Sequence, residues 1–256
     1  MKKICLFCDN AAGSLEHLFP KWILKRVPKT LFLGDIGRHK DKTLGYEFTV
    51  KSVCRNCNNG WMHRLEDETI PIMGPMLSEQ SSFLDVVSQR TIAAWALKTA
   101  MVLDSTAIAK HRPLFYSRAE RISLRESLRI PLRTFVWLGH SLDFGLACSS
   151  IATHLTILSP FHPYSLKEST LGQVSTFLVC NLAIQVMTVH VPAEYSDGAI
   201  DISPPEGPWG DLLVSVWPPS RLSYWPPPLA FDSSISTLDL RTLTNRWKMG
   251  NERVVF

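Results

Sequence analysis

Cys5-Leu-Phe-Cys8 and Cys54-Arg-Asn-Cys57 are the two stretches of this chain that decide how its first quarter folds. Each is a C-x2-C pair, in which two intervening residues allow the backbone to turn tightly enough for both thiolates to reach one metal ion. Four thiolates at about 2.3 Å form a closed tetrahedral Zn2+ site that leaves no open position for water. We therefore predict that Cys5, Cys8, Cys54 and Cys57 hold a structural zinc ion.

The start of the chain, MKKICLFCDN, has two lysines but no apolar stretch of signal-peptide length behind them. The longest apolar run elsewhere is interrupted by Asn181 and Gln185, so it is too short and too polar to span a bilayer. These features predict a cytoplasmic protein with no membrane partner, a setting in which paired cysteines favour metal over disulfides. The remaining cysteines, Cys148 and Cys180, lie in apolar sequence and are predicted to be buried thiols.

The net charge of +4 is concentrated at one end of the 256-residue chain. Residues 1–68 hold 12 Lys and Arg against 8 Asp and Glu, whereas the remainder holds 15 against 15. A basic segment attracts polyanions by releasing their counterions, so the first quarter is predicted to contact nucleic acid; a merely solvated basic surface is the alternative. The basic residues expected along a DNA backbone are Lys21, Lys25, Arg26, Arg38, Lys40 and Lys42.

Between the cysteine pairs the chain reads Ser-Leu-Glu16-His17-Leu-Phe-Pro20, and Asn58 follows the second pair directly. An acidic residue followed by His, with Pro three positions after the His, and then C-x2-C-Asn at the head of a helix, resembles the HNH nucleases. The likeness is to the zinc-bearing subgroup that includes a phage junction-resolving endonuclease. It covers roughly residues 5–68, about a quarter of the chain.

The resemblance implies a ββα-metal fold, a β-hairpin followed by a helix, that hydrolyses DNA phosphodiester bonds. Glu16 and Asn58 would bind one catalytic Mg2+ or Mn2+, and His17 would be the general base that activates water. Double-stranded or branched DNA would be the partner, and a homodimer is compatible with this class of enzyme.

The residue types suit that chemistry in their own right. Phosphodiester hydrolysis needs a water that loses its proton near neutral pH, and His is the side chain whose pKa suits that task. It also needs a cation on the scissile phosphate, and Mg2+ prefers the oxygen ligands that a Glu carboxylate and an Asn amide supply. Adjacent strand residues point to opposite sides, so Glu16 and His17 would face one ion only at an irregular strand end.

Several assignments around the second cysteine pair stay open. Members of the family more often carry Asp where this chain has Glu16, whose side chain is one methylene longer. Asn59 and His63 stand i,i+4 apart on the expected helix, so they would present ligands together in place of Asn58. Asn58 would alternatively serve only as a helix cap. His63 and Arg64 would either contact phosphate or lie on a solvated face of the helix.

The sequence after the second cysteine pair predicts a helix that begins near Cys57. Trp61 and Leu65 are spaced i,i+4 and mark one buried helical face. The proline- and glycine-containing residues 71–84 are predicted to be a linker, since these residue types punctuate regular structure.

Residues 85–256 are predicted to form an α+β accessory domain of unknown role. Apolar spacing predicts a helix over 88–110 and an amphipathic helix over 118–130. The segments rich in β-branched and aromatic residues, which predict an antiparallel sheet, are 133–139, 144–151, 155–158, 176–191 and 212–217. The fold class is therefore α+β: a zinc-stapled ββα-metal module at residues 1–70, then a helix pair and a mainly antiparallel β domain.

Taken together, the motifs and the charge predict a metal-dependent HNH endonuclease that cuts DNA. The accessory domain would select the substrate, sense a signal or mediate dimerisation, with phage defence or DNA processing as the setting by analogy alone. The alternative is a non-catalytic zinc-binding module that contacts nucleic acid or a protein. Such a module would keep the four cysteines without needing Glu16 and His17 in their places.

Overall fold

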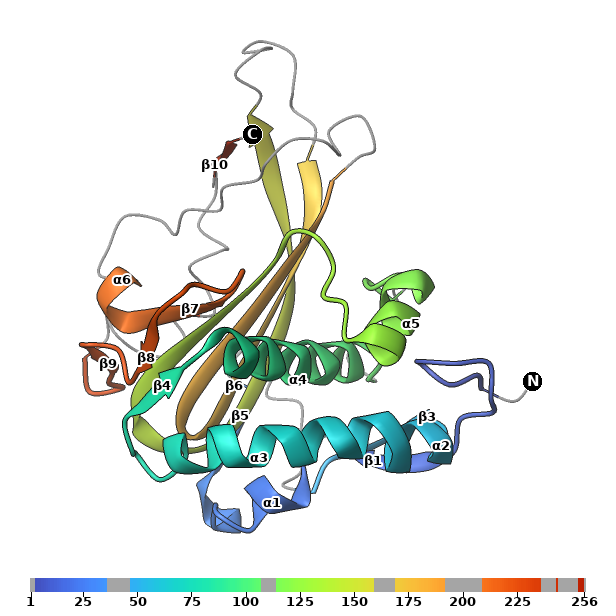
Figure 1. Ribbon diagram of the computed structural model, residues 1–256, viewed down its shortest axis with the longest axis horizontal. Helices are drawn as coiled ribbons and strands as arrows, with labels where there is room; N and C mark the ends of the chain where they lie inside the picture. The colour runs from blue at the N-terminus through green and yellow to red at the C-terminus, as the bar shows by residue number, and fades with distance from the viewer. Residues whose placement is uncertain are drawn as a thin grey trace.

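Two long antiparallel strands, β5 (Thr134–Leu158) and β6 (Ser169–His190), curve behind a layer of helices in the computed structural model (Figure 1). The fold is mixed α+β, as the sequence predicts. The residues that the structure describes are 3–35, 47–106, 114–158, 169–191, 209–235, 243 and 253–255.

A tight hairpin opens the described chain and carries the first cysteine pair at its turn. The backbone N–H of Cys5 donates to the carbonyl of Asn10 at 2.8 Å, and Ile4 forms an antiparallel bridge with Ala11. The hairpin therefore folds back on itself and holds the Cys5–Cys8 turn at one end of the molecule.

The next strand, β1 (Ser14–His17), pairs antiparallel with β3 (Thr49–Val53). In this pairing Glu16 lies opposite Val50. The register shifts between Ser14 and Glu16, whereas Glu16 and His17 pair in regular succession with Val50 and Thr49.

The chain between β1 and β3 begins with a short helix, α1 (Lys21–Leu24), followed by a 3-10 turn, η1 (Lys29–Leu31). Strand β2 (Phe32–Asp35) comes next and joins the large sheet by pairing parallel with β5. Residues 36–46 lie outside the described residues, and with them the predicted DNA-contacting residues Arg38, Lys40 and Lys42.

Helical structure follows β3 at once, in three joined pieces. They are α2 (Arg55–Cys57), the π-helical turn η2 (Asn58–Met62) and α3 (His63–Met76), with a kink at Gly60, whose φ and ψ are −101° and −108°. The predicted order for residues 5–68 is a β-hairpin followed by a helix. In the structure β1 and β3 pair and a helix follows β3, but α1, η1 and β2 lie between the two strands, so they do not form a hairpin.

Residues 71–84, predicted to be an irregular linker, are instead mostly regular structure. Helix α3 continues through Pro71 and Pro75 to Met76, and strand β4 (Ser82–Leu84) follows after a turn. Proline removes a backbone donor and normally interrupts a helix, which is why the sequence predicts a break here. Met76 is fully buried, so tertiary packing of the last turns outweighs the local preference.

Helix α4 (Val86–Asp104) is the central helix of the described structure. The carboxylate of Asp85 caps it by accepting the Ser88 N–H at 2.7 Å. Every side chain over residues 92–104 is buried, because α4 packs against α3 on one side and against β5 and β6 on the other (Figure 1). The predicted helix over 88–110 ends at Asp104, and residues 107–110 lie outside the described residues.

Helix α5 (Arg118–Ser127) begins at a capping box. The hydroxyl of Ser117 accepts the Glu120 N–H, and the Glu120 carboxylate accepts the Ser117 N–H. The predicted helix over 118–130 ends early because Leu128 adopts a left-handed conformation with φ of 49°.

Strand β5 unites three segments that the sequence predicts as separate strands. The stretch from His140 to Gly145, predicted to contain a turn, is accommodated as an irregularity in the pairing with β6. Strand β6 begins at Ser169, before the predicted start at residue 176. The two strands thus form one continuous bent ladder in place of several short hairpins.

Short strands and a helix complete the architecture. Helix α6 (Trp209–Leu212) leads into β7 (Leu213–Trp217), which pairs antiparallel with β5 as predicted for residues 212–217. Unlike the predicted antiparallel strands, β2 and two further segments pair parallel with β5. The remaining strands are β8 (Ser223–Trp225), which pairs with β4, and the two parallel partners β9 (Ala230–Phe231) and β10 (Arg253–Val255).

One hydrophobic core runs from the first quarter of the chain into the rest. It includes Cys8 and Ile23 from the N-terminal part together with Trp95 of α4 and Val186 of β6. The residues on either side of the predicted domain boundary are therefore packed against each other. Within the described residues, no helix combines the length and the apolar character needed to cross a membrane.

Gly139 of β5 is a point where the sheet tolerates no side chain. A Cβ there would lie 2.6 Å from Cε2 of Phe231 and 3.2 Å from the carbonyl of Leu212. We predict that Gly139→Ala lowers the free energy of unfolding by about 1–3 kcal/mol, as overpacked cores do. The matched control is Gly210→Ala, whose Cβ would have no atom within 4 Å. Equal denaturant midpoints for the two variants would contradict this close packing.

Candidate functional site

The four cysteines of the two C-x2-C pairs meet in one cluster. Their sulfur atoms all lie within 4.8 Å of one another, and all four side chains are buried. Sγ of Cys8 lies 3.5 Å from Sγ of Cys54. Four buried thiols at this spacing are the ligand set of a structural Zn2+ site, which confirms the predicted cluster.

Hydrogen bonds from the backbone hold the sulfur atoms in place. The N–H of Cys54 donates to Cys5 Sγ at 3.2 Å, and the N–H of Cys57 donates to Cys54 Sγ at 3.4 Å. The N–H of Phe7 donates to Cys5 Sγ at 3.5 Å. Donors aimed at sulfur stabilise thiolates and orient them, as the groups surrounding metal ligands commonly do.

The environment of the cluster shifts its thiol pKa values in different directions. Burial raises the pKa of Cys57, and the neighbouring Cys5 raises it further. Burial also acts to raise the pKa of Cys54, but hydrogen bonds from Cys57, Cys8 and Cys5 outweigh it and lower that pKa to about 7. The lowered pKa of Cys54 favours its thiolate, which is the form that binds metal.

Helix α5 docks on the cysteine hairpin through arginines spaced along one face. Arg118 pairs with the carboxylate of Asp9, and Nε of Arg121 donates to the carbonyl of Leu6 at 2.8 Å. One turn further along α5, Arg125 reaches over the cluster. The hairpin is therefore tied to a helix more than a hundred positions away in sequence.

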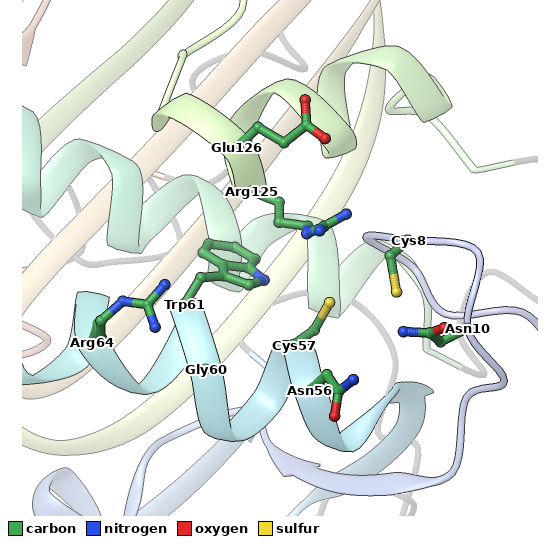
Figure 2. A pocket seen from close by; sticks show the side chains of 9 residues that line it. All are labelled: Cys8, Asn10, Asn56, Cys57, Gly60, Trp61, Arg64, Arg125 and Glu126. Carbon is green, nitrogen blue, oxygen red and sulfur yellow. The ribbon is translucent and has the colours of Figure 1, made fainter.

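A cavity of about 440 Å³ lies beside the cluster, between the hairpin, η2 and α5. Figure 2 shows Arg125 extending toward the side formed by Cys8 and Cys57, with the indole of Trp61 beside it. Zinc bound by four thiolates carries a net negative charge, so a guanidinium at this place offsets charge near the cluster. We assign this cavity to the zinc scaffold.

A second cavity, of about 550 Å³, opens between β1, α1 and α3, and we call it the β1–α3 cleft. It collects four of the five residues predicted for catalysis or metal binding. Its lining comprises Leu15, Glu16, His17, Pro20, Lys21, Trp22, Lys25, Arg26, Asn58, His63, Glu66, Asp67 and Ile70.

The predicted residues present themselves differently to the β1–α3 cleft. His17 and Asn58 are half-buried, and His63 is exposed. The Asn58 amide nitrogen donates to Ser14 Oγ at 2.9 Å and to the Leu15 carbonyl at 3.0 Å, which ties the head of the helix to β1. Asn59, the open alternative to Asn58, is exposed and does not line the cleft.

Glu16 lies at the floor of the cleft and is 5% exposed. Its Oε1 is 3.5 Å from Nζ of Lys98, which lies 3.2 Å from Oε1 of Glu66 on its other side. Burial raises the pKa of Glu16; Lys98 counteracts this rise and Glu66 adds to it. The Glu16 carboxylate is thus held in a buried cluster of two acids and one base, which we call the Glu–Lys–Glu cluster.

The Glu–Lys–Glu cluster contains two residues to which sequence reasoning assigned no role, Lys98 and Glu66. A signal for Lys98 exists in the sequence, because it is a lysine within the apolar stretch Trp95-Ala-Leu-Lys98-Thr-Ala-Met. Lysine is almost never fully buried unless it is paired, so such a position implies an acidic partner. Which acid it meets depends on how α4 packs against β1 and α3.

The rim of the β1–α3 cleft along α1 is basic. Lys21, Lys25 and Arg26 are exposed there. Arg26 is held by a hydrogen bond from Nη1 to the Trp22 carbonyl at 2.9 Å, with its guanidinium 5.8 Å from the centre of that indole ring. The cleft therefore combines an acidic floor with a basic edge.

Comparison with known proteins adds no assignment: no family model, no curated protein and no solved structure matches this chain.

The cysteine cluster predicts about one zinc ion per chain in the purified protein, measurable by mass spectrometry of metals. Cys54→Ser should abolish zinc binding and unfold the N-terminal part, because structural zinc supplies about 10–16 kcal/mol in zinc-finger peptides. Cys148→Ala, which alters a buried cysteine outside the cluster, should keep the zinc. Full zinc content in Cys54→Ser would contradict a four-thiolate site.

Proposed function

We propose that this protein is a metal-dependent endonuclease of the HNH type that hydrolyses phosphodiester bonds in DNA. The observation that carries the proposal is the convergence of Glu16, His17, Asn58 and His63 on the β1–α3 cleft. These residues come from two separated parts of the sequence, β1 and the helical segment that follows its partner strand β3. A basic rim on the same cleft suits a polyanionic substrate.

His17 is the residue proposed to take a proton from the attacking water. It is half-buried at the end of β1 and lines the cleft together with its buried neighbour Glu16. A neutral imidazole accepts a proton near pH 7, which makes His17 the cleft residue suited to general-base catalysis.

The side chains of the cleft fit a hard divalent ion such as Mg2+ or Mn2+. Oxygen donors are available from Glu16, the Asn58 amide and Asp67, with the His63 imidazole beside them. A bound ion would neutralise charge on the scissile phosphate and stabilise the leaving oxygen. Glu16 and Asn58 are proposed as the ligands of this ion, with Asn59 and His63 as alternatives. The basic residues Lys21, Lys25 and Arg26 are proposed to orient the phosphate.

A second candidate function is a non-catalytic zinc module that only binds nucleic acid or a protein. The observation that favours it is the burial of Glu16, whose carboxylate already has Lys98 as a partner. In that case the Glu–Lys–Glu cluster would be purely structural, and the basic rim would account for binding alone.

A plasmid-nicking assay with Mg2+ or Mn2+ separates the two functions. We predict that wild type converts supercoiled DNA to nicked or linear forms and that His17→Ala reduces the rate by about 100- to 10,000-fold, the usual contribution of a general base. The matched control is His190→Ala, since His190 pairs with Glu120 outside the cleft. Absence of cutting by wild type with any divalent ion on supercoiled, linear, branched or single-stranded DNA would favour the binding module.

The basic rim makes a separate prediction about DNA affinity, which holds for either function. Each phosphate contact contributes a slope of about −0.9 to the dependence of log K on log salt concentration. Lys25→Ala should therefore weaken binding and make the slope shallower by about 0.9. Lys51→Ala removes the same charge from an exposed position on β3 that does not line the cleft. The same slope in both variants would show that the rim does not contact the backbone.

A further inference from the structure

Lys98 is the most deeply buried charged side chain near the β1–α3 cleft, at 1% exposure. It belongs to α4, the central helix, and not to β1, α1 or α3, which form the cleft. Its Nζ lies 3.2 Å from Glu66 Oε1 on α3 and 3.5 Å from Glu16 Oε1 on β1. A single ammonium thus joins α4 to α3 and to β1.

Several contacts restrict the orientation of the Lys98 side chain. Besides the two carboxylates, its Nζ lies 5.7 Å from the centre of the Trp95 ring. Removing one member of a buried charged cluster is strongly unfavourable, because the charge left behind loses its partner. Glu16 and Lys98 are both buried, at 5% and 1% exposure.

We infer that Lys98 is a positioning residue for the divalent-metal site of the cleft, holding one oxygen of Glu16 so that the other is available as a ligand. The inference rests on the proposed function, because it takes Glu16 as a ligand. Lys98 pairs with Oε1 of Glu16 and Oε1 of Glu66, and in the proposed site an ion would bind the other oxygen of Glu16. Glu66 anchors Lys98 from the side of α3.

The strand β1 places the backbone of Glu16 but does not fix the torsion angles of its side chain. Glu16 pairs with Val50 in the ladder with β3. A glutamate also has one more rotatable bond than an aspartate at the same place. Lys98 supplies the constraint that the strand lacks, and it thereby links the cleft to the core helix α4.

The test is the affinity for Mn2+ alone, measured by electron paramagnetic resonance titration of the zinc-loaded full chain without DNA. Lys98→Met should weaken Mn2+ binding by about 10- to 100-fold, the usual effect of losing a partner of a metal ligand. Lys51→Met, the same substitution at an exposed position on β3, should leave the Mn2+ affinity within about twofold. Zinc content and circular dichroism verify that each variant is folded.

Two further variants keep the test decisive if Lys98→Met does not fold. Lys98→Gln retains a hydrogen-bond donor at the same place without the charge, and it should weaken Mn2+ binding in the same direction. In a Glu16→Gln background, replacing Lys98 should cause no further loss, because a residue that acts through Glu16 has nothing left to position. Additive losses from the two substitutions would overturn the inference.

The outcomes separate this inference from the proposed function. Unchanged or tighter Mn2+ binding in folded Lys98→Met or Lys98→Gln overturns the positioning role while leaving the metal site intact. If wild type binds Mn2+ no better than Glu16→Gln does, the metal site itself fails and both proposals fall. If Mn2+ binding by wild type depends on Glu16 and on Lys98 but wild type cuts no DNA, the inference stands and the nuclease proposal falls.

Discussion

The meeting of the two cysteine pairs is the constraint on which the cleft depends. The hairpin that carries Cys5 leads into β1, and the turn that carries Cys57 leads into the helix, so joining the sulfur atoms fixes both elements at once. The backbone bond from Cys54 to Cys5 Sγ locks the two turns together. Asn58, the residue after the cluster, is thereby brought to donate to the Leu15 carbonyl beside Glu16 and His17. A metal scaffold and a candidate site are thus built from neighbouring residues.

This scaffold does not stand apart from the rest of the chain. A small metal-stapled module usually has little apolar core of its own. Here Trp95 of α4 and the first-quarter residues belong to one continuous core. Polar contacts follow the same route, because Arg121 of α5 holds the cysteine hairpin and Lys98 of α4 holds the cleft floor. Any signal or ligand that shifted α4 or α5 would therefore act directly on the groups that shape the cleft.

Local sequence patterns predicted those features that depend on local geometry. Cysteine spacing indicated the metal cluster, and the spacing of Trp61 and Leu65 indicated the helix after it. Local patterns failed where packing overrides residue preference. Helix α3 passes through Pro71 because its last turns are buried, and β5 continues through residues 140–145 because β6 pairs with it on both sides of the irregularity. Proline and turn residues mark where the chain prefers to break, and tertiary contacts decide whether it does.

The sequence by itself determined the ligands of the cluster, because these follow from cysteine chemistry and spacing along the chain. The motif resemblance named Glu16, His17 and Asn58, which line one cleft. The sequence also determined the mixed α+β class, because the spacing of apolar residues indicates helices and strands before it is known which elements pack together. Only the tertiary structure decided that Glu16 is buried against Lys98 and that Arg118 and Arg121 bind the hairpin that carries Cys5 and Cys8. Such pairings join residues that lie more than 80 positions apart in sequence, and their strength comes from desolvation that exists only after helices α4 and α5 have packed.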